Sequence, residues 1–248
     1  MNIFQRIKRR SEYRKKMQVF KNEFGIFSAL SAVGEKRFDL SWNKIQPCLD
    51  DKTTGTEFDR HYVYHTAWAA RQLEKHKPEK HTDISSSLYF AGIVSAFIPV
   101  DFYDFRPADI RLDNLASSEA NLLSLHFIDN SIASLSCMHV VEHIGLGRYG
   151  DSLDPDGDLK AINELKRVLA PKGILLFVVP VGKPQIRFNA HRIYSHKQII
   201  EYFKELELVD FDIIPDDKAD GGLVHDPSHH LLSKQNYGCG CFAFRKPV

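Results

Sequence analysis

Cysteine is scarce in this chain, which has four thiols in 248 residues. Cys48, Cys137, Cys239 and Cys241 are too few and too scattered for a disulfide scaffold. The last two form a C-x-C pair, which differs from the C-x-x-C repeat of zinc sites and redox motifs. Because a chain without a disulfide framework fits a reducing compartment, we expect a cytoplasmic protein.

A membrane-spanning run and a charge imbalance are also missing. The longest apolar stretch, Leu88 to Val100, contains Ser95 and is shorter than the ~20 residues that cross a bilayer. No apolar segment follows the basic start of the chain, so we expect no signal peptide. A formal net charge of +1 gives no electrostatic reason for a nucleic-acid partner, and we expect no nucleic-acid binding.

Residues 1–60 form a helical and irregular extension in our interpretation. Residues 1–24 are basic with apolar residues at helical spacing, which predicts one or two amphipathic helices. Residues 25–60 predict short helices and loops. The basic helix either makes weak contact with an anionic membrane surface or is a solvated helix packed on the domain, and the sequence leaves both open.

From residue 61 onward, helical and extended patterns alternate. Residues 61–77 predict a helix with Val63, Ala67, Ala70 and Leu73 on one face. Strands are predicted at 81–85, 99–105, 131–139, 174–180, 208–215 and 238–248, and further helices at 91–97, 156–173 and 194–206. This alternation predicts an α/β protein with a Rossmann-like, doubly wound sheet as one domain over residues 61–248.

In such a sheet, ligands bind beyond the carboxyl ends of the strands, and three segments are expected there. D-I-S-S-S, starting at Asp83, follows the first strand but lacks the close-set glycines of a cofactor loop. Asp104 lies twenty-one residues later, near the spacing at which a carboxylate binds a ribose. H-V-V-E-H-I-G, starting at His139, ends another strand. Because no G-x-G-x-x-G follows the first strand, a nicotinamide dehydrogenase is the poorer interpretation.

Two longer segments, EANLLSLHFIDNSIASLSCMHVVEHIG and DLKAINELKRVLAPKGILLFVVP, resemble the pattern of class I S-adenosylmethionine-dependent methyltransferases. DISSSLYFAG, DFRP and HVVEHIGLGRYGDSLDPDGD are similar to a bacterial and nematode subgroup catalogued as a domain of unknown function. This resemblance covers the chain from about residue 60 to its end. It implies a seven-stranded sheet whose last strand is antiparallel, with S-adenosyl-L-methionine as the cofactor.

The resemblance also implies cofactor-binding residues along the edge of the sheet. They are Asp83, Ser85, Ser86 and Ser87 at the methionine end, Asp104 at the ribose, Asn121 and Leu122 at the adenine, and His139 beneath the methionine part. The family's D-x-G-x-G is D-I-S-S-S here, so Ser85 stands where a glycine would allow close backbone approach. The alternative is therefore a non-catalytic binding or scaffold module with a decayed cofactor site.

The H-x-x-E-H segment supplies the catalytic candidates His139, Glu142 and His143. Its order differs from the H-E-x-x-H of zinc proteases, so no metal site is expected. Two interpretations stay open: a role toward cofactor or substrate, or a strand-end turn in which Glu142 and His143 bond to the backbone. If the acceptor is a hydroxyl, its deprotonation needs a base, for which His143 or His139 is the candidate.

A substrate-binding rim is predicted next to these groups, because binding groups favour loops on a rigid scaffold. Its candidates are Arg148, Tyr149 and Asp151 in the following loop, with His191 and Arg192 beyond the 174–180 strand. We expect methyl transfer to a small-molecule or glycan acceptor, with a sugar or polysaccharide precursor as the substrate of an O-methylation. The sequence specifies neither the acceptor nor the oligomeric state.

Overall fold

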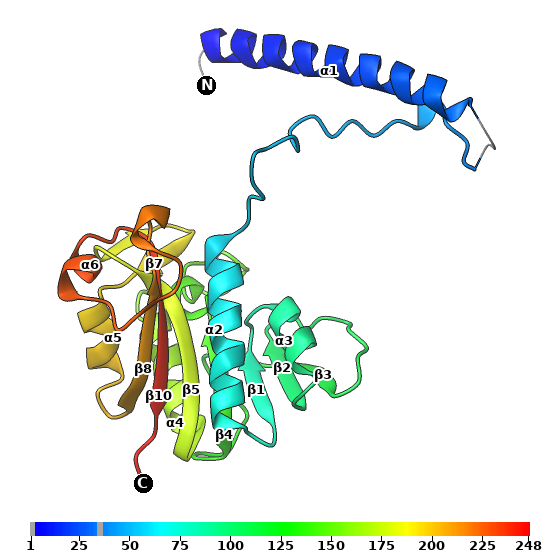
Figure 1. Ribbon diagram of the computed structural model, residues 1–248. Coiled ribbons are helices and arrows are strands. Elements are labelled where there is room, and N and C mark those ends of the chain that lie inside the picture. The colour runs from blue at the N-terminus through cyan, green and yellow to red at the C-terminus, as the bar shows by residue number, and fades with distance from the viewer. Residues whose placement is uncertain (1–2, 34–36) are drawn as a thin grey trace. The chain divides into compact units, whose positions relative to one another are not determined.

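The computed structural model describes residues 3–33 and 37–248. The chain divides into two compact units, Met1–Glu57 and Phe58–Val248, which are described separately (Figure 1). The first unit is built on one helix of 29 residues, α1 (Ile3–Ser31), where the sequence predicts one or two. Of the helices described, none has both the length and the apolar content to cross a membrane.

The first unit also contains a 3₁₀ turn, η1 (Trp42–Lys44). The Trp42 ring lies edge-on against the ring of Phe24, with centroids 5.0 Å apart. Most other large apolar side chains of α1 are exposed, including Phe4 and Leu30. This aromatic contact joins the C-terminal half of the helix to the segment that follows it, and an ion pair of Lys16 with Asp50 joins its middle.

A single large sheet organises the second unit. The strands of this unit are β1 (His81–Ile84), β2 (Val100–Asp104), β3 (Leu115–Glu119), β4 (Ile132–Met138), β5 (Leu169–Val181), β6 (Gln185–Arg187), β7 (His191–Ile193), β8 (Glu207–Ile214), β9 (Val224–His225) and β10 (Gly238–Arg245). The sheet order is β3-β2-β1-β4-β5-β10-β8-β9, and β6 pairs with β7 separately (Figure 1).

Strand direction confirms the predicted Rossmann-like sheet. Neighbours from β3 to β5 pair in parallel, whereas β10 pairs antiparallel with both β5 and β8. The expected sheet has seven strands with the last one antiparallel, and the two-residue β9 adds an eighth strand beside β8. The short β9 extends the edge of the sheet and leaves the seven expected strands in place.

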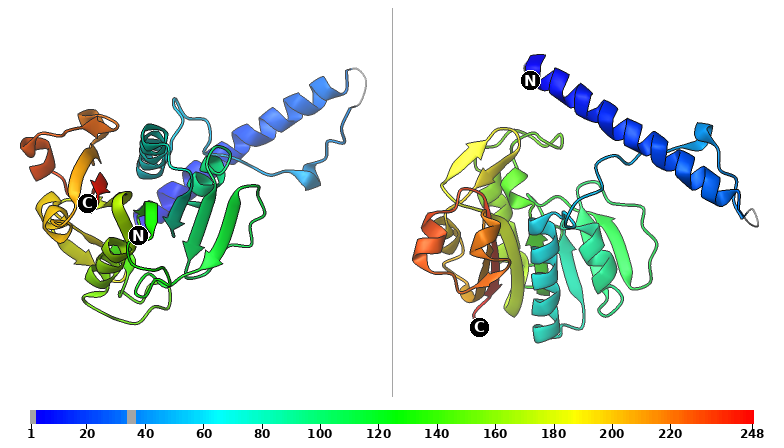
Figure 2. Two further views of the ribbon diagram at one scale, coloured as in Figure 1. Left: turned by 90° about the horizontal axis from the view of Figure 1, so that it is seen from below. Right: turned by 45° about the horizontal axis from the view of Figure 1, so that its top comes forward.

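Helices cover both faces of the sheet (Figure 2). They are α2 (Arg60–His76), α3 (Leu88–Val94), α4 (Gly157–Val168), α5 (His196–Tyr202) and α6 (His229–Ser233), with 3₁₀ turns η2 (Val141–His143) and η3 (Lys218–Asp220). Successive side chains of β5 point to opposite faces. Leu176 packs in one core with Trp68 of α2, and Phe177 packs in the other with Leu165 of α4. The strand is therefore apolar on both sides, as its continuous apolar run indicates.

The face that α2 buries differs from the predicted face. Val63 and Ala70 are exposed, and the buried residues are His65, Trp68, Ala69, Gln72 and Leu73. Polar side chains can face inward here because they find partners: Gln72 donates to Asp210, and Nδ1 of His65 donates to the carbonyl of His61 at 2.6 Å. A pattern built on apolar residues alone therefore selects the wrong side of this helix.

Candidate functional site

Two neighbouring cavities lie where β1, β2 and β4 end. The larger cavity has a volume of about 740 Å³ and the smaller cavity about 340 Å³. Both volumes fall within the roughly 300–1,000 Å³ of small-molecule sites. Ser85, His139, His143 and Tyr149 line both cavities, so the two form one cleft with two parts.

The serine loop after β1 is fastened to the two neighbouring strands. Ser85 has a φ of 56°, a left-handed conformation that costs energy in a residue with a side chain. Its N–H and its hydroxyl both donate to the carbonyl of Tyr103, at 2.7 and 3.1 Å. The hydroxyl of Ser86 accepts from the N–H of Met138 at 3.0 Å. Of the three serines, Ser85 alone lines the two cavities of the cleft, while Ser86 and Ser87 line an adjoining depression that shares Asp104 with the smaller cavity.

Asp83, a predicted cofactor-binding residue, supports this loop from beneath and lines neither cavity. The carboxylate is fully buried and accepts from the N–H of Ser86 at 2.9 Å and from the hydroxyl of Ser136. The His81 ring lies between the hydroxyls of Ser134 and Ser136, at 2.8 Å from each. The carboxylate oxygens of Asp83 are occupied by these hydrogen bonds, which belong to a network that joins β1 to β4. The side chain therefore positions the loop.

The predicted ribose and adenine residues meet in one wall of the smaller cavity. Asp104, Asn121 and Leu122 line it together with Val140 and Ile144. Asp104 accepts from a backbone N–H through Oδ1 at 2.8 Å, which fixes the orientation of its carboxylate. A carboxylate beside apolar side chains suits a nucleoside, since the ribose offers hydroxyl donors and the base a flat, weakly polar face.

The larger cavity is lined by imidazole and phenol rings. Its four histidines are His61, His139, His143 and His191, and three tyrosines join them. The structure thus brings together predicted residues from the H-x-x-E-H segment, the following loop and β7. Such a lining combines flat apolar surface with polar groups of adjustable charge, which suits a polar organic ligand.

His139 and Glu142 form a buried pair at the end of β4. Nδ1 of His139 lies 2.9 Å from Oε1 of Glu142, and the two side chains are 6% and 1% exposed. Burial lowers the pKa of His139 to about 4 and raises the pKa of Glu142 to about 7. A neutral His139 therefore donates its Nδ1–H to this carboxylate. Oε2 of Glu142 has no hydrogen-bond partner within residues 3–33 and 37–248.

His143 is oriented as a base. Its Nδ1 donates to the carbonyl of Ala190 at 2.6 Å, which leaves the lone pair of the neutral ring on Nε2. Oε1 of Glu142 lies 3.9 Å from that Nε2. Burial lowers the pKa of His143, and the nearby Glu142 charge opposes this by raising it. A neutral imidazole with a fixed tautomer can accept a proton, and the carboxylate stabilises the cation that forms.

The loop between η2 and α4 is shaped by glycine and by one carboxylate. Asp151 accepts from the N–H groups of Gly145, Gly147 and Tyr149 at 2.7, 3.3 and 3.2 Å. Gly145 has a φ of 81°, and a Cβ there would lie 2.1 Å from the carbonyl oxygen of Asp154. A side chain at Gly145 would therefore break the close packing that gives this loop its fixed shape.

Tyr149 is the part of this loop that lies in both cavities. The guanidinium groups of Arg106 and Arg148 lie 5.0 and 5.1 Å from the centroid of its ring. Contacts of this kind stabilise by ~0.5–1 kcal/mol at exposed sites. The predicted rim residues Arg148 and Tyr149 therefore line the cleft, and Asp151 lines the smaller cavity while it organises the loop backbone.

Arg192, a predicted residue of the substrate rim, lines neither cavity. Its guanidinium is buried, donates to the carbonyls of Ile144 and Pro155 at 2.6 and 3.1 Å, and lies 3.5 Å from Asp158. His191, its neighbour on β7, lines the larger cavity instead. Adjacent side chains of a strand point to opposite sides, so one of the pair faces the cleft and Arg192 braces the loop from within.

Several cavity residues lie outside the predicted set. His61 and Tyr62 come from the first turn of α2, and Tyr237 precedes β10. The Tyr62 ring stacks on His139 with centroids 5.7 Å apart. The expected topology could have indicated these residues. A helix that leads into β1 starts at the carboxyl edge of the sheet, and an antiparallel last strand starts at the same edge, so the first residues of both lie near the cleft.

Buried ionisable groups in this unit respond to pH in two senses. Burial lowers the pKa of four histidines: to about 4 for His61 and His139, and to about 3 for His65 and His81. Burial raises the pKa of two acids: to about 6 for Asp83 and to about 7 for Glu142. As pH falls below 6.5, the histidines protonate mainly in the unfolded chain and stability is lost. The two acids have the opposite effect. Because the four histidines outnumber the two acids and the pKa shifts are of similar size, the free energy of unfolding should fall as the pH falls.

Solved structures with the same architecture include methyltransferases. An N-methyltransferase, NodS of Bradyrhizobium japonicum WM9 in complex with S-adenosyl-L-homocysteine, has 14% identity and a TM-score of 0.52, covering 77% of this chain and 90% of its own. A 1,6-didemethyltoxoflavin N1-methyltransferase of Burkholderia thailandensis has 12% identity and a TM-score of 0.50, covering 74% and 79%. The fold of the second unit is therefore that of class I S-adenosylmethionine-dependent methyltransferases.

Residues 110–215 match the model of a family described as "Caenorhabditis protein of unknown function, DUF268". This confirms the resemblance to a domain of unknown function over less than half of the chain. An uncharacterized protein of Methanocaldococcus jannaschii is 34% identical over 98 residues, which is 38% of this chain. The match spans 37% of that relative's length.

Proposed function

We propose that this chain is an S-adenosylmethionine-dependent methyltransferase. The observation that supports this most is the wall of the smaller cavity, where Asp104, Asn121 and Leu122 meet beside Ser85. These residues come from strand ends far apart in the sequence, in the order that a nucleoside-bearing cofactor requires. The methyltransferase fold agrees with this assignment, and S-adenosyl-L-methionine is the proposed cofactor.

The residues of the smaller cavity would hold the nucleoside part. The carboxylate of Asp104 would accept hydrogen bonds from the ribose hydroxyls, and Leu122 would contact the adenine face. Ser85 would border the methionine part. When bound, S-adenosylmethionine supplies a methyl group that its positive sulfur activates. The task of the chain is then to orient an acceptor and to exclude water.

His143 is the proposed general base toward a hydroxyl acceptor. Its Nε2 would accept the hydroxyl proton, and Glu142 would stabilise the resulting imidazolium across the 3.9 Å that separates them. His139 would act through Glu142 by fixing the carboxylate with its Nδ1–H. Tyr149, in contact with Arg106 and Arg148, would cover the junction of the cavities and keep water from the reacting atoms.

The proposed acceptor is a small molecule with hydroxyl groups, such as a sugar or polysaccharide precursor. The larger cavity supports this because it offers tyrosine rings as flat apolar surface next to charged groups that bind hydroxyls. Arg148 and Glu142 both line it and provide hydrogen-bond donors and acceptors. O-methylation would follow from the presence of an oriented imidazole base in the same cavity.

Calorimetry with S-adenosylhomocysteine tests the cofactor assignment. We expect micromolar binding by the unaltered chain and at least a tenfold loss in Asp104→Asn, which removes the charge that accepts the ribose hydrogen bonds. Asp101→Asn is the matched control: it lies on the same strand, forms an ion pair with Lys80 at 2.5 Å and lines neither cavity. Absence of binding at millimolar ligand would instead favour a non-catalytic scaffold.

A further inference from the structure

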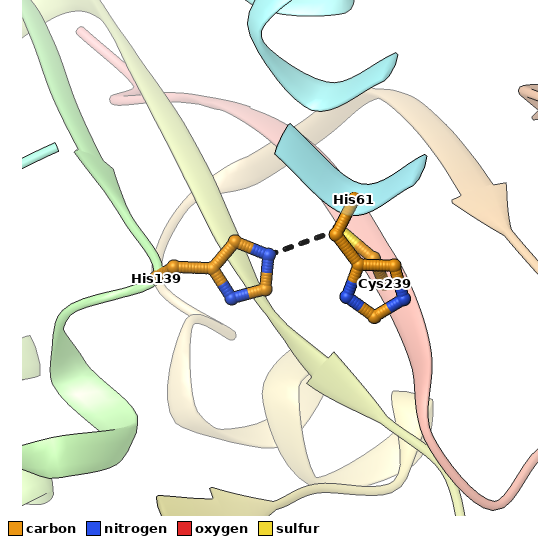
Figure 3. A group of neighbouring side chains, drawn as sticks. All are labelled: His61, His139 and Cys239. Atoms are coloured by element: carbon orange, nitrogen blue, oxygen red, sulfur yellow. Dashed lines mark hydrogen bonds between the residues drawn. The ribbon is translucent and has the colours of Figure 1, made fainter. Parts of the chain in front are cut away.

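Three side chains with metal-ligating atoms lie close together (Figure 3), and two of them line the larger cavity. They are His61 in the first turn of α2, His139 after β4 and Cys239 near the start of β10. Each offers one ligand atom, and these atoms all lie within 4.8 Å of one another. The three segments meet because the parallel β4 ends, and the antiparallel β10 begins, at the same edge of the sheet.

The spacing of the ligand atoms is close to that of a zinc site. Zinc–nitrogen and zinc–sulfur bonds of ~2.0 and ~2.3 Å at a tetrahedral angle separate the ligand atoms by about 3.4–3.6 Å. Nε2 of His139 lies 3.3 Å from Sγ of Cys239, so this pair already has the required separation. The His61 ring is nearly parallel to that of His139, and its ligand atom needs a movement of at most about 1.4 Å to reach this separation.

The surroundings of His139 are those of a metal ligand. Its second ring nitrogen, Nδ1, donates to the buried carboxylate of Glu142 at 2.9 Å, which assigns Nε2 as the ligand nitrogen. Metal-ligating histidines almost always donate their other N–H to a carboxylate or carbonyl in this way, which fixes the ring and makes it more basic. The other oxygen of Glu142 is buried and without a hydrogen-bond partner among the residues described.

We propose that His61, His139 and Cys239 bind a zinc ion whose fourth position faces the larger cavity. Two imidazoles and one thiolate match zinc, which takes three protein ligands and one open position in its catalytic sites. His61 and His139 themselves line the larger cavity, so a ligand there would have access to the ion. Binding releases the thiol proton of Cys239, since the thiolate is the ligand form.

An ion at this position would select acceptors with an oxygen or sulfur donor. A zinc-bound hydroxyl or thiol loses its proton at neutral pH far more readily than the free group. The ion would therefore bind the acceptor of the proposed methyl transfer through the very atom that is methylated. The site itself rests on the geometry of three segments and is independent of the proposed methyl transfer.

Cobalt titration tests the site in the full chain with Cys48, the exposed thiol, changed to serine. We expect a single Co²⁺ per chain, with the visible bands of tetrahedral cobalt and the near-ultraviolet band of a cobalt–thiolate bond. Cys239→Ser should abolish the near-ultraviolet band, and His61→Gln should weaken binding at least about tenfold. Glu142→Gln should keep the band and lower affinity by about 10–100-fold, as loss of the supporting carboxylate predicts.

Cys241→Ser is the matched control, because Cys241 is also fully buried on β10 and belongs to the same core. It should keep both sets of bands, and circular dichroism of each variant confirms that the fold is retained. Absence of cobalt bands in the parent chain, or a thiolate band that survives Cys239→Ser, would overturn the proposal. S-adenosylhomocysteine calorimetry on the same samples separates the two proposals, because either can fail while the other holds.

Discussion

Replacing Ser85 by glycine tests how the serine loop shapes the cleft. Ser85 is left-handed with a φ of 56°, which costs a residue with a side chain about 1–2 kcal/mol. The glycine loses the hydroxyl bond to Tyr103, 3.1 Å long and worth roughly 0.5–1.5 kcal/mol, and gains about 0.5–1 kcal/mol of chain entropy in the unfolded state. These terms nearly cancel, so the free energy of unfolding should change by less than about 1 kcal/mol.

Cofactor affinity should change more than stability in Ser85→Gly. Ser85 lines both cavities, so removal of its side chain makes room for close backbone approach to a bound ligand. A gain of about 1 kcal/mol in binding free energy corresponds to roughly fivefold tighter binding of S-adenosylhomocysteine, which calorimetry measures. Urea unfolding of the same variant is measured in parallel. Ser87→Gly is the control, since Ser87 lies outside the cleft. Equal or weaker binding by Ser85→Gly, or the same gain in Ser87→Gly, would refute the reasoning.

Three further changes have defined outcomes. Gly145→Ala should lower the free energy of unfolding by at least about 2 kcal/mol. Gly150 is also left-handed, but nothing lies within 4 Å of a Cβ there, so Gly150→Ala should lower it by only about 1 kcal/mol. Similar urea midpoints for the two variants would contradict this. Lowering the pH from 7 to 5 should reduce stability, because burial lowers the pKa of His81 to about 3 and of His139 to about 4; a constant urea midpoint would contradict the neutral histidines. His143→Gln should leave S-adenosylhomocysteine binding unchanged and cut turnover of a hydroxyl acceptor about 10²–10⁴-fold, and unchanged turnover would remove His143 as the base.

Much of the sheet could be predicted from sequence because its signals are local. The continuous apolar run of β5 is typical of a strand buried on both faces, and both of its faces are covered. Ser195 and Gln198 have capping-box spacing, and the structure contains both hydrogen bonds of that box at the start of α5. The buried face of α2 could not be predicted, because two polar side chains face inward: Gln72 through a partner distant in sequence, Asp210, and His65 through the carbonyl of His61 one turn earlier.

The site residues also divide into those with a local sequence signal and those whose position depends on distant segments. Asp104, Asn121 and Leu122 follow strands in sequence, so their meeting at one edge could be predicted from the fold class. Arg192 could not be separated from His191 without knowing which side of β7 faces the cleft. Cys239 carries no local signal for a ligand, since its role depends on an antiparallel strand that begins beside the end of β4.

A crystal of the full chain soaked with S-adenosylhomocysteine tests the central claim most directly. We expect difference density in the smaller cavity, with the ribose hydroxyls against the carboxylate of Asp104 and the adenine against Leu122. The thioether end should point toward the larger cavity, past Ser85. Ligand density at another place on the chain, or no density in crystals equilibrated with millimolar ligand, would contradict the proposed methyltransferase.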